Sequence, residues 1–106
     1  MPDPVETAPS REDLDKSNGK ILIEFGAEHC GYCLAAKPYI LEALREVPQI
    51  KHIKIEDGPG KKLGRSFKVK LWPSLILLQD GKEIGRIVRP ETLYEVQELL
   101  KLGNHI

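Results

Sequence analysis

Two cysteines stand between an apolar run and a helical pattern, and this junction constrains the fold more than any other part of the chain. The run at residues 21–23 is apolar and rich in β-branched side chains, which is typical of a buried strand. Apolar residues recur at helical spacing over residues 34–47 and predict a helix after the cysteines. A helix N-terminus has unpaired N–H groups and a partial positive charge, which stabilise a thiolate. Because their spacing is Cys-x-x-Cys, Cys30 and Cys33 are predicted to form a redox-active dithiol.

The first half of the chain predicts a short helix and a second strand besides the cysteine segment. Residues 1–9 contain three prolines and are interpreted as a flexible arm. Ser10 with Asp13 resembles a capping box, which would start a helix that ends near residue 17. Residues 50–55 are predicted to form a strand. Because a strand–helix–strand connection is a right-handed crossover, this strand should run parallel to the one before the cysteines.

The second half predicts a short helix, a hairpin and a closing helix. Two apolar residues four positions apart suggest a helix over residues 61–67. Asp80-Gly81 is a strong hairpin signal between strands at residues 75–79 and 83–88. Pro90 suits the first turn of a final helix. The apolar stripe of that helix consists of Leu93, Val96, Leu99, Leu100 and Leu102. Helices should therefore cover both faces of a mixed sheet, which is an α/β fold.

Length and charge narrow the classes of function. The chain has 106 residues with 16 Lys and Arg and 16 Asp and Glu, so its net charge is zero. We expect a single domain at residues 10–106 and neither nucleic acid nor an anionic membrane as a partner. No apolar run is long enough to span a membrane, and the first residues lack the apolar core of a signal peptide. The predicted location is the cytoplasm, with the periplasm or export as the alternative if a signal sequence was removed.

The cysteine segment resembles the active-site segment of the thioredoxin family. The matching stretches are Ile21-Leu22-Ile23-Glu24-Phe25 and Ala27-Glu28-His29-Cys30-Gly31-Tyr32-Cys33. Further along, Pro38 matches a helix kink of the family, and Trp72-Pro73-Ser74 resembles its cis-proline loop. The resemblance covers roughly residues 11–102, and this ordered pattern is more specific than Cys-x-x-Cys alone. It implies a thioredoxin fold, which is a three-layer αβα sandwich with a central mixed β-sheet.

The resemblance also implies roles for three residues in thiol–disulfide exchange. Cys30 is the candidate nucleophile, and it would form a mixed disulfide with a substrate. Cys33, one turn inside the helix, is the candidate resolving thiol and should be buried with a raised pKa. Glu24 lies in the apolar strand where thioredoxins carry a buried acid, usually aspartate, that exchanges a proton with the resolving cysteine. The alternative is a glutamate at an edge of the sheet with its head in solvent.

Four residues are candidates for binding the substrate, and a fifth for tuning the dithiol. By resemblance, Pro73 is expected to be cis, which would place the backbone of Trp72 beside the sulfurs. The Trp72 ring is either an exposed docking surface or part of the core. Gly31-Tyr32 stands where thioredoxins have Gly-Pro and resembles the pair of periplasmic disulfide isomerases and some glutaredoxins. His29 replaces a tryptophan, and a cationic imidazole there would stabilise the Cys30 thiolate; a solvated loop histidine is the alternative.

Two further features are either plain surface or functional. Arg89 stands where thioredoxins usually have a glycine that lets a substrate approach, so it would narrow the groove, select an acidic substrate, or be solvated surface. A local cluster of positive charge is interpreted as a solvated face rather than a partner site. That cluster consists of Lys61, Lys62, Arg65, Lys68 and Lys70.

The function predicted from these residues is thiol–disulfide oxidoreductase, reducing protein disulfides through Cys30 and Cys33. The expected partners are disulfide-containing proteins and an upstream reductase, and the expected protein is a monomer without a cofactor. One alternative is a periplasmic-type isomerase or oxidant. Less favoured are a non-catalytic module and a metal or glutaredoxin-like iron–sulfur site. A zinc site needs four ligands, and only His29, His52 and His105 could add nitrogen to the two cysteines.

Overall fold

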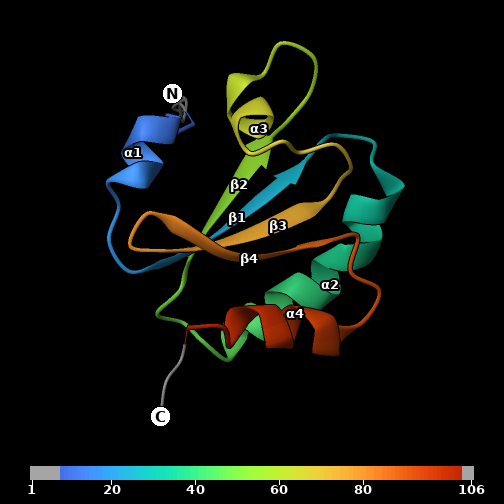
Figure 1. Ribbon diagram of the computed structural model, residues 1–106. Coiled ribbons are helices and arrows are strands. Elements are labelled where there is room, and N and C mark those ends of the chain that lie inside the picture. Colours follow the sequence, from blue (N-terminus) through green and yellow to red (C-terminus); the bar gives the residue numbers. More distant parts are fainter. Residues whose placement is uncertain (1–7, 104–106) are drawn as a thin grey trace, which may run out of the picture.

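A four-stranded mixed sheet forms the centre of the molecule in this computed structural model, which describes residues 8–103 (Figure 1). Its strands are β1 (Lys20–Gly26), β2 (Lys51–Glu56), β3 (Ser74–Gln79) and β4 (Lys82–Val88), in the order β2-β1-β3-β4. β1 runs parallel to β2 and antiparallel to β3, and β3 is antiparallel to β4. The predicted parallel pair and the hairpin are therefore confirmed. Most of the predicted N-terminal arm lies outside the described residues, as does His105.

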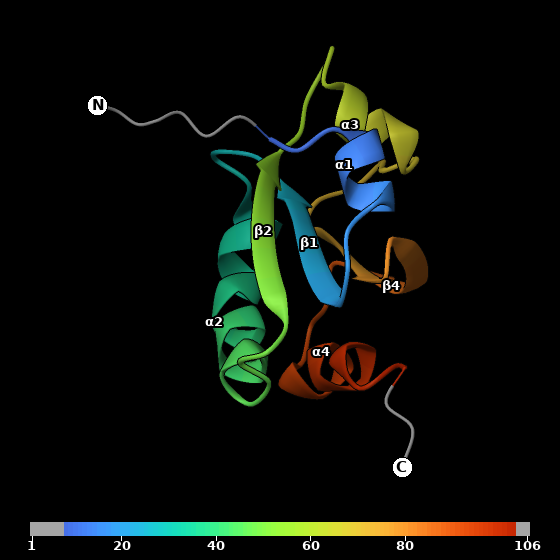
Figure 2. The same cartoon turned by 90° about the vertical axis from the view of Figure 1, so that its left-hand side faces the viewer.

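Helices cover both faces of this sheet. They are α1 (Arg11–Asp15), α2 (Gly31–Arg45), α3 (Lys62–Ser66) and α4 (Leu93–Leu100). α2 and α4 lie on one face, and α1 and α3 lie on the other, as Figures 1 and 2 show from two directions. The expected three-layer αβα sandwich is confirmed.

Successive strand residues point to opposite faces, so each face of the sheet has its own core. Leu22, Leu75 and Leu77 pack with Ile40 and Val96 under α2 and α4. The other core lies under α1 and α3 and contains Leu14, Ile21, Ile23, Phe25, Ile55, Phe67, Ile76 and Leu78. Glu24 belongs to the first face, because it lies in β1 between two residues that point to the second.

The β3–β4 turn is tied to the start of β1. Asp80 and Gly81 have φ values of 50° and 84°, as the predicted two-residue hairpin requires. The Asp80 N–H donates to the Gly19 carbonyl at 3.0 Å, and the Gly19 N–H donates to Asp80 Oδ1 at 2.8 Å. A Cβ at Gly81 would meet the backbone carbonyl of Asp15 at the end of α1. The turn therefore joins the hairpin to the α1–β1 junction.

The buried face of α2 differs from the one suggested by its leucines. Leu34 is 70% exposed and Leu41 is 46% exposed, whereas Ala36, Ile40 and Ala43 are buried. These three residues have the i, i+4, i+7 spacing of a helix face. Small alanines let the helix lie close to the sheet, and the larger leucines are left on the solvent side.

The start of α4 also differs from the prediction. Pro90 is buried ahead of the helix and does not lie in its first turn. Thr92 is the N-cap instead: its hydroxyl accepts a hydrogen bond from the Glu95 N–H at 3.2 Å, and the Glu95 carboxylate accepts from the Thr92 N–H at 3.1 Å. This reciprocal capping box satisfies two free N–H groups and therefore determines where the helix begins. The predicted box at Ser10 and Asp13 is confirmed at α1.

Candidate active site

Cys30 is the N-cap of α2 and lies where β1 has just ended. Its backbone is extended, with φ −97° and ψ 110°, and its sulfur accepts a hydrogen bond from the Cys33 N–H at 3.1 Å. This N–H is one of the donors that a helix N-terminus leaves without a partner. The contact favours negative charge on the Cys30 sulfur, as a nucleophilic thiolate needs.

Cys33 lies one turn further on and has different surroundings. Burial raises the pKa of the Cys33 thiol to about 11, and the hydrogen bond with Cys30 contributes in the same direction. Its sulfur lies so close to β1 that a Cβ at Gly26 would be 3.0 Å away. The two cysteines are half-buried and not bonded to each other. Cys33 is therefore held as a thiol, one helical turn inside the N-cap sulfur of Cys30.

Glu24 and Cys33 line the same cavity, whose volume is about 480 Å³. Cys30, His29 and Lys54 also line it. The Glu24 side chain is only 6% exposed, and its carboxylate is 2.8 Å from Nε2 of His52, whose side chain is 22% exposed. Glu24 is thus a buried acid on the face that α2 covers, as the resemblance implied.

His52 was missed as a partner of Glu24, although the sequence held a signal for it. Glu24 and Lys54 are partners in the parallel register of β1 and β2. His52 lies two residues before Lys54 in β2 and therefore points to the same face. Once the register of β1 and β2 is known, the alternation along β2 places His52 on the face of the buried acid.

The loop ahead of β3 contains the expected cis peptide bond, between Trp72 and Pro73. Pro73 is fully buried, and its carbonyl accepts a hydrogen bond from the Arg89 N–H at 2.9 Å. The Trp72 ring is half-buried, packs against the core under α1 and α3, and donates from Nε1 to the Asp57 carboxylate at 2.9 Å. The ring therefore contributes to packing, and its role as a docking surface stays a prediction.

Arg89 links this loop to the residues between the cysteines. Its Nε donates to the Trp72 carbonyl at 2.9 Å, and its guanidinium lies 3.9 Å from the centre of the Tyr32 ring. Arg89 holds a φ of 53°, a left-handed conformation that costs a side-chain-bearing residue free energy. Tyr32 is 58% exposed, so the Arg89–Tyr32 pair lies at the surface beside the dithiol.

The other residues of interest are exposed. A Cβ added at Gly31 would meet no atom within 4 Å, and His29 lies in the loop before Cys30 with a φ of 62°. The positive cluster is exposed at every position, namely Lys61, Lys62, Arg65, Lys68 and Lys70. Its interpretation as a solvated face is consistent with this exposure.

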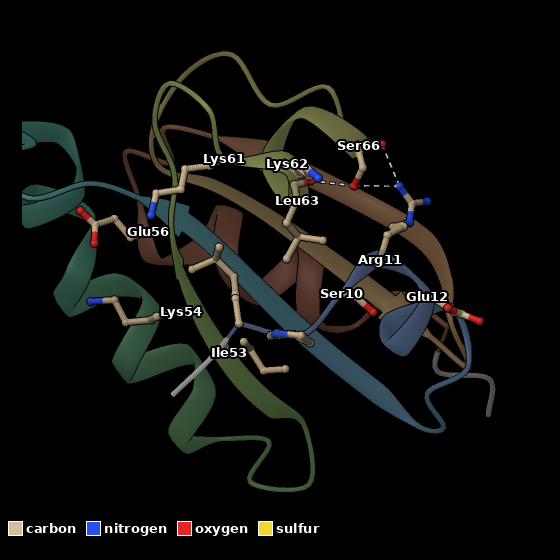
Figure 3. A pocket seen from close by; sticks show the side chains of 13 residues that line it. Ser10, Arg11, Glu12, Ile53, Lys54, Glu56, Lys61, Lys62, Leu63 and Ser66 are labelled. Carbon is tan, nitrogen blue, oxygen red and sulfur yellow. Dashed lines mark hydrogen bonds between the residues drawn. The ribbon is translucent and has the colours of Figure 1, made fainter. Parts of the chain in front are cut away.

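A larger concavity, of about 880 Å³, lies against β2 (Figure 3). Ile53 and Leu63 line it with the lysines Lys54, Lys61 and Lys62. At one side of it, the Arg11 guanidinium donates to the Ser66 carbonyl at 2.7 Å. Neither cysteine lines this groove, but Lys54, Ile55 and Glu56 line both it and the cavity at the cysteines, so the two concavities adjoin along β2.

The described residues contain neither a cluster of metal ligands nor a membrane-spanning helix. Within residues 8–103, no three His, Cys, Asp or Glu side chains are placed to hold a metal ion together. Among the helices of the same residues, none combines the length and the apolar character that a membrane span requires.

A dithiol at a helix N-terminus, with one sulfur capping the helix and the other kept protonated, is suited to reversible thiol–disulfide exchange. A cis-proline loop joined to the residue between the cysteines completes the site. These features define the class of thiol–disulfide oxidoreductases.

Comparison with known proteins identifies the family. The Thioredoxin family model matches residues 4–101. The chain is 33% identical to an H-type thioredoxin from Fagopyrum esculentum, over 76% of this chain and 73% of that protein. It is 37% identical to a thioredoxin from Chlamydia trachomatis, over 81% of both chains. Its structure is similar to reduced thioredoxin 2 from Pseudomonas aeruginosa, with a TM-score of 0.80 and 47% identity over 89% of this chain and 87% of that one. The chain belongs to the thioredoxin family and is a thiol–disulfide oxidoreductase with a Cys30/Cys33 pair.

Proposed function

We propose that the chain acts as a reductase of disulfides in other proteins, supplied with electrons by a separate reductase. The observation that carries this proposal is the difference between the two sulfurs. The Cys30 sulfur receives the helix N–H at 3.1 Å, whereas the pKa of Cys33 is raised to about 11. The first arrangement favours attack on a disulfide, and the second keeps the resolving thiol unreactive until a mixed disulfide has formed.

The reaction then has two exchange steps. The Cys30 thiolate attacks one sulfur of the substrate disulfide and releases the other as a thiolate. Cys33 attacks the Cys30 sulfur of the mixed disulfide, loses its proton to Glu24, and releases the second substrate sulfur as a thiolate, which takes a proton from water. Two electrons pass to the substrate, and the Cys30–Cys33 disulfide that remains must be reduced by the partner reductase.

Substrate contacts are assigned to the residues around Cys30. The Trp72 backbone supplies the surface on which an extended substrate segment would pair, and the buried cis Pro73 fixes its direction. Gly31 leaves the approach to the dithiol open, and Tyr32 offers an exposed ring next to it. His29, beside Cys30, is the candidate that tunes the dithiol. The chain would act as a monomer in the cytoplasm.

The reduction potential of the Cys30/Cys33 pair tests this proposal. It is measured by equilibration with glutathione redox buffers, with Trp72 fluorescence or alkylation of free thiols as the readout. A value near −270 mV, as in thioredoxin, supports a reductase. A value between about −180 and −120 mV contradicts it and favours an isomerase or oxidant outside the cytoplasm, with His29 and Tyr32 as the residues to exchange.

A further inference from the structure

Glu24 is a charged residue buried on the face of the sheet that α2 and α4 cover, where the core is otherwise apolar. It is 6% exposed and lies among apolar neighbours, with Leu22 on its own strand and Leu75 opposite it on β3. A carboxylate in such surroundings needs a hydrogen-bonding partner. His52 provides one, because its Nε2 is 2.8 Å from Glu24 Oε1.

The two ends of this pair face different surroundings. Glu24 lines the cavity that also contains Cys33, and its charge contributes to the raised pKa of the Cys33 thiol. His52 is absent from the lining of that cavity, and its side chain is 22% exposed. The buried Glu24 therefore lies between the cavity that Cys33 lines and the partly exposed His52.

Other charged groups face Glu24 from the cavity side. Lys54 and Glu56 come from β2, Lys37 from α2, and Glu28 and His29 from the loop before Cys30. β3 contributes the apolar Leu75. The charges of both signs on the cavity side act on Glu24 over a distance, whereas His52 contacts its carboxylate directly.

We propose that His52 is a positioning residue that carries protons between Glu24 and solvent during the resolving step. The inference rests on the proton-accepting role of Glu24 in the proposed function. When Cys33 attacks the mixed disulfide, its thiol proton passes to the Glu24 carboxylate. In the Nδ1–H tautomer of His52, Nε2 is unprotonated and accepts the proton from Glu24. The imidazolium then releases the proton of Nδ1 to water, and proton exchange with water restores the Nδ1–H tautomer before the next cycle. No electrons move in this relay, and Glu24 is returned to its ionised form for the next cycle.

Imidazole suits this role because its charge changes between about pH 5 and 8. Its two nitrogens allow a proton to enter on one side of the ring and leave on the other. A glutamine side chain can donate the same hydrogen bond to Glu24 but cannot carry a proton near neutral pH. His52→Gln therefore separates proton transfer from hydrogen bonding, and His52→Val removes both.

The experiment follows a single turnover with dithiobis(nitrobenzoate) as the disulfide, in stopped flow. The reduced protein releases one thionitrobenzoate when Cys30 attacks and a second when Cys33 resolves the mixed disulfide. In His52→Gln, we expect the second phase to slow about tenfold near neutral pH and to lose its dependence on pH between about 5 and 8, while the first phase is unchanged. In a Glu24→Gln background, His52→Gln should have no further effect, because His52 acts through Glu24. A thermal melt checks that each variant is folded.

Three results would overturn the inference. The second phase of His52→Gln could match the wild type at every pH while His52→Val is slow, which would make His52 a hydrogen-bonding residue only. His52→Gln could slow the second phase as much in the Glu24→Gln background as it does alone, which would show that it acts elsewhere. Glu24→Gln could leave the second phase unchanged, so that neither residue transfers the proton. Failure of the proposed reductase function would look different, because it would appear in the reduction potential of the Cys30/Cys33 pair and not in the comparison of the two thionitrobenzoate phases between variants.

Discussion

The redox site has an outer half and an inner half, which differ in exposure and in what they contact. The outer half consists of Cys30, Tyr32, Arg89 and the Trp72 carbonyl, and Arg89 joins the Trp72 carbonyl to Tyr32 by a hydrogen bond and a cation–π contact. The inner half consists of Cys33, Gly26, Glu24 and His52, between α2 and the sheet. One helical turn separates the two sulfurs. Variants of the outer half should therefore change attack and substrate binding, whereas variants of the inner half should change resolution.

The largest expected difference between the halves is in the capture of a substrate as a covalent complex, and it is measured by replacing each cysteine separately. Cys33→Ser should still attack a protein disulfide but retain the substrate as a stable covalent complex. Cys30→Ser should form no complex, because the remaining thiol has a raised pKa of about 11. Non-reducing gels and mass spectrometry distinguish the two results. If Cys33 alone captured substrate as efficiently as Cys30 alone, the outer and inner assignments would be reversed.

Glu24→Leu tests whether the Glu24 carboxylate speeds the resolving step while it lowers the free energy of unfolding. The resolving step should slow by about a hundredfold, because a general acid–base group is lost. The free energy of unfolding should increase by about 1 kcal/mol, since an apolar residue replaces a buried charge and His52, whose side chain is 22% exposed, can bind water instead. Urea unfolding and stopped-flow kinetics measure the two effects. A stability loss of several kcal/mol would show that the Glu24–His52 pair is structural.

Gly26→Ala tests how closely Cys33 is held against β1. The added Cβ would lie 3.0 Å from the Cys33 sulfur, so the thiol must shift. We expect resolution to slow about fivefold and the stability to fall by about 1 kcal/mol, as in other overpacked sites. Gly31→Ala is the matched control, because nothing lies within 4 Å of its added Cβ. Equal effects from both variants would argue against close contact at Gly26.

Arg89→Gly and Arg89→Ala probe the outer half together. Both variants free the Trp72 carbonyl for a substrate backbone, so we expect KM for a protein disulfide to fall a few-fold in each, with no change in the resolving step. Only glycine adopts the φ of 53° without strain, so Arg89→Gly should be more stable than Arg89→Ala by about 1 kcal/mol. Steady-state kinetics and thermal melts provide the measurements. A higher KM in both variants would instead show that the guanidinium attracts the substrate.

The smallest expected effect is a dependence of stability on pH in the alkaline range. Burial raises the pKa of the Cys33 thiol from its ordinary value of 9.0 to about 11 in the folded protein. The unfolded chain therefore loses this proton first as the pH rises, so the contribution to stability is fully present below pH 9.0 and is lost through about pH 11. In Cys33→Ala, this part of the alkaline decrease should disappear from the free energy of unfolding. A decrease identical to that of the wild type would place its origin in other groups.

Local patterns were enough to predict most of the fold. The capping box at Ser10, the Asp80-Gly81 turn and the parallel pairing of β1 with β2 are each specified within a short stretch or by a general rule of connection. The buried face of α2 was harder, because leucines at helical spacing suggest a core and only the packing distance to the sheet shows that alanines are preferred. Pro90 was also misleading, since the Thr92–Glu95 box two residues later determines the start of α4.

Some residues of the redox site could be predicted from the sequence, and others could not. Cys30 and Cys33 are found from their spacing, and His52 could have been placed beside Glu24 from the register of β1 and β2. The Arg89 contacts are different, because they join three segments that are far apart in the sequence. A charged residue in a loop gives no sign that its side chain will reach the Trp72 carbonyl and the Tyr32 ring.

The β3–β4 turn has a consequence for engineering of the chain. A two-residue hairpin turn is ordinarily a convenient place to insert a peptide or a tag. Here Asp80 exchanges two hydrogen bonds with Gly19, and Gly81 packs under the end of α1, so an insertion would separate the hairpin from the first helix. At Gly58, in the connection from β2 to α3, an added Cβ would meet no atom within 4 Å. That connection is the better place to graft a foreign sequence onto this scaffold.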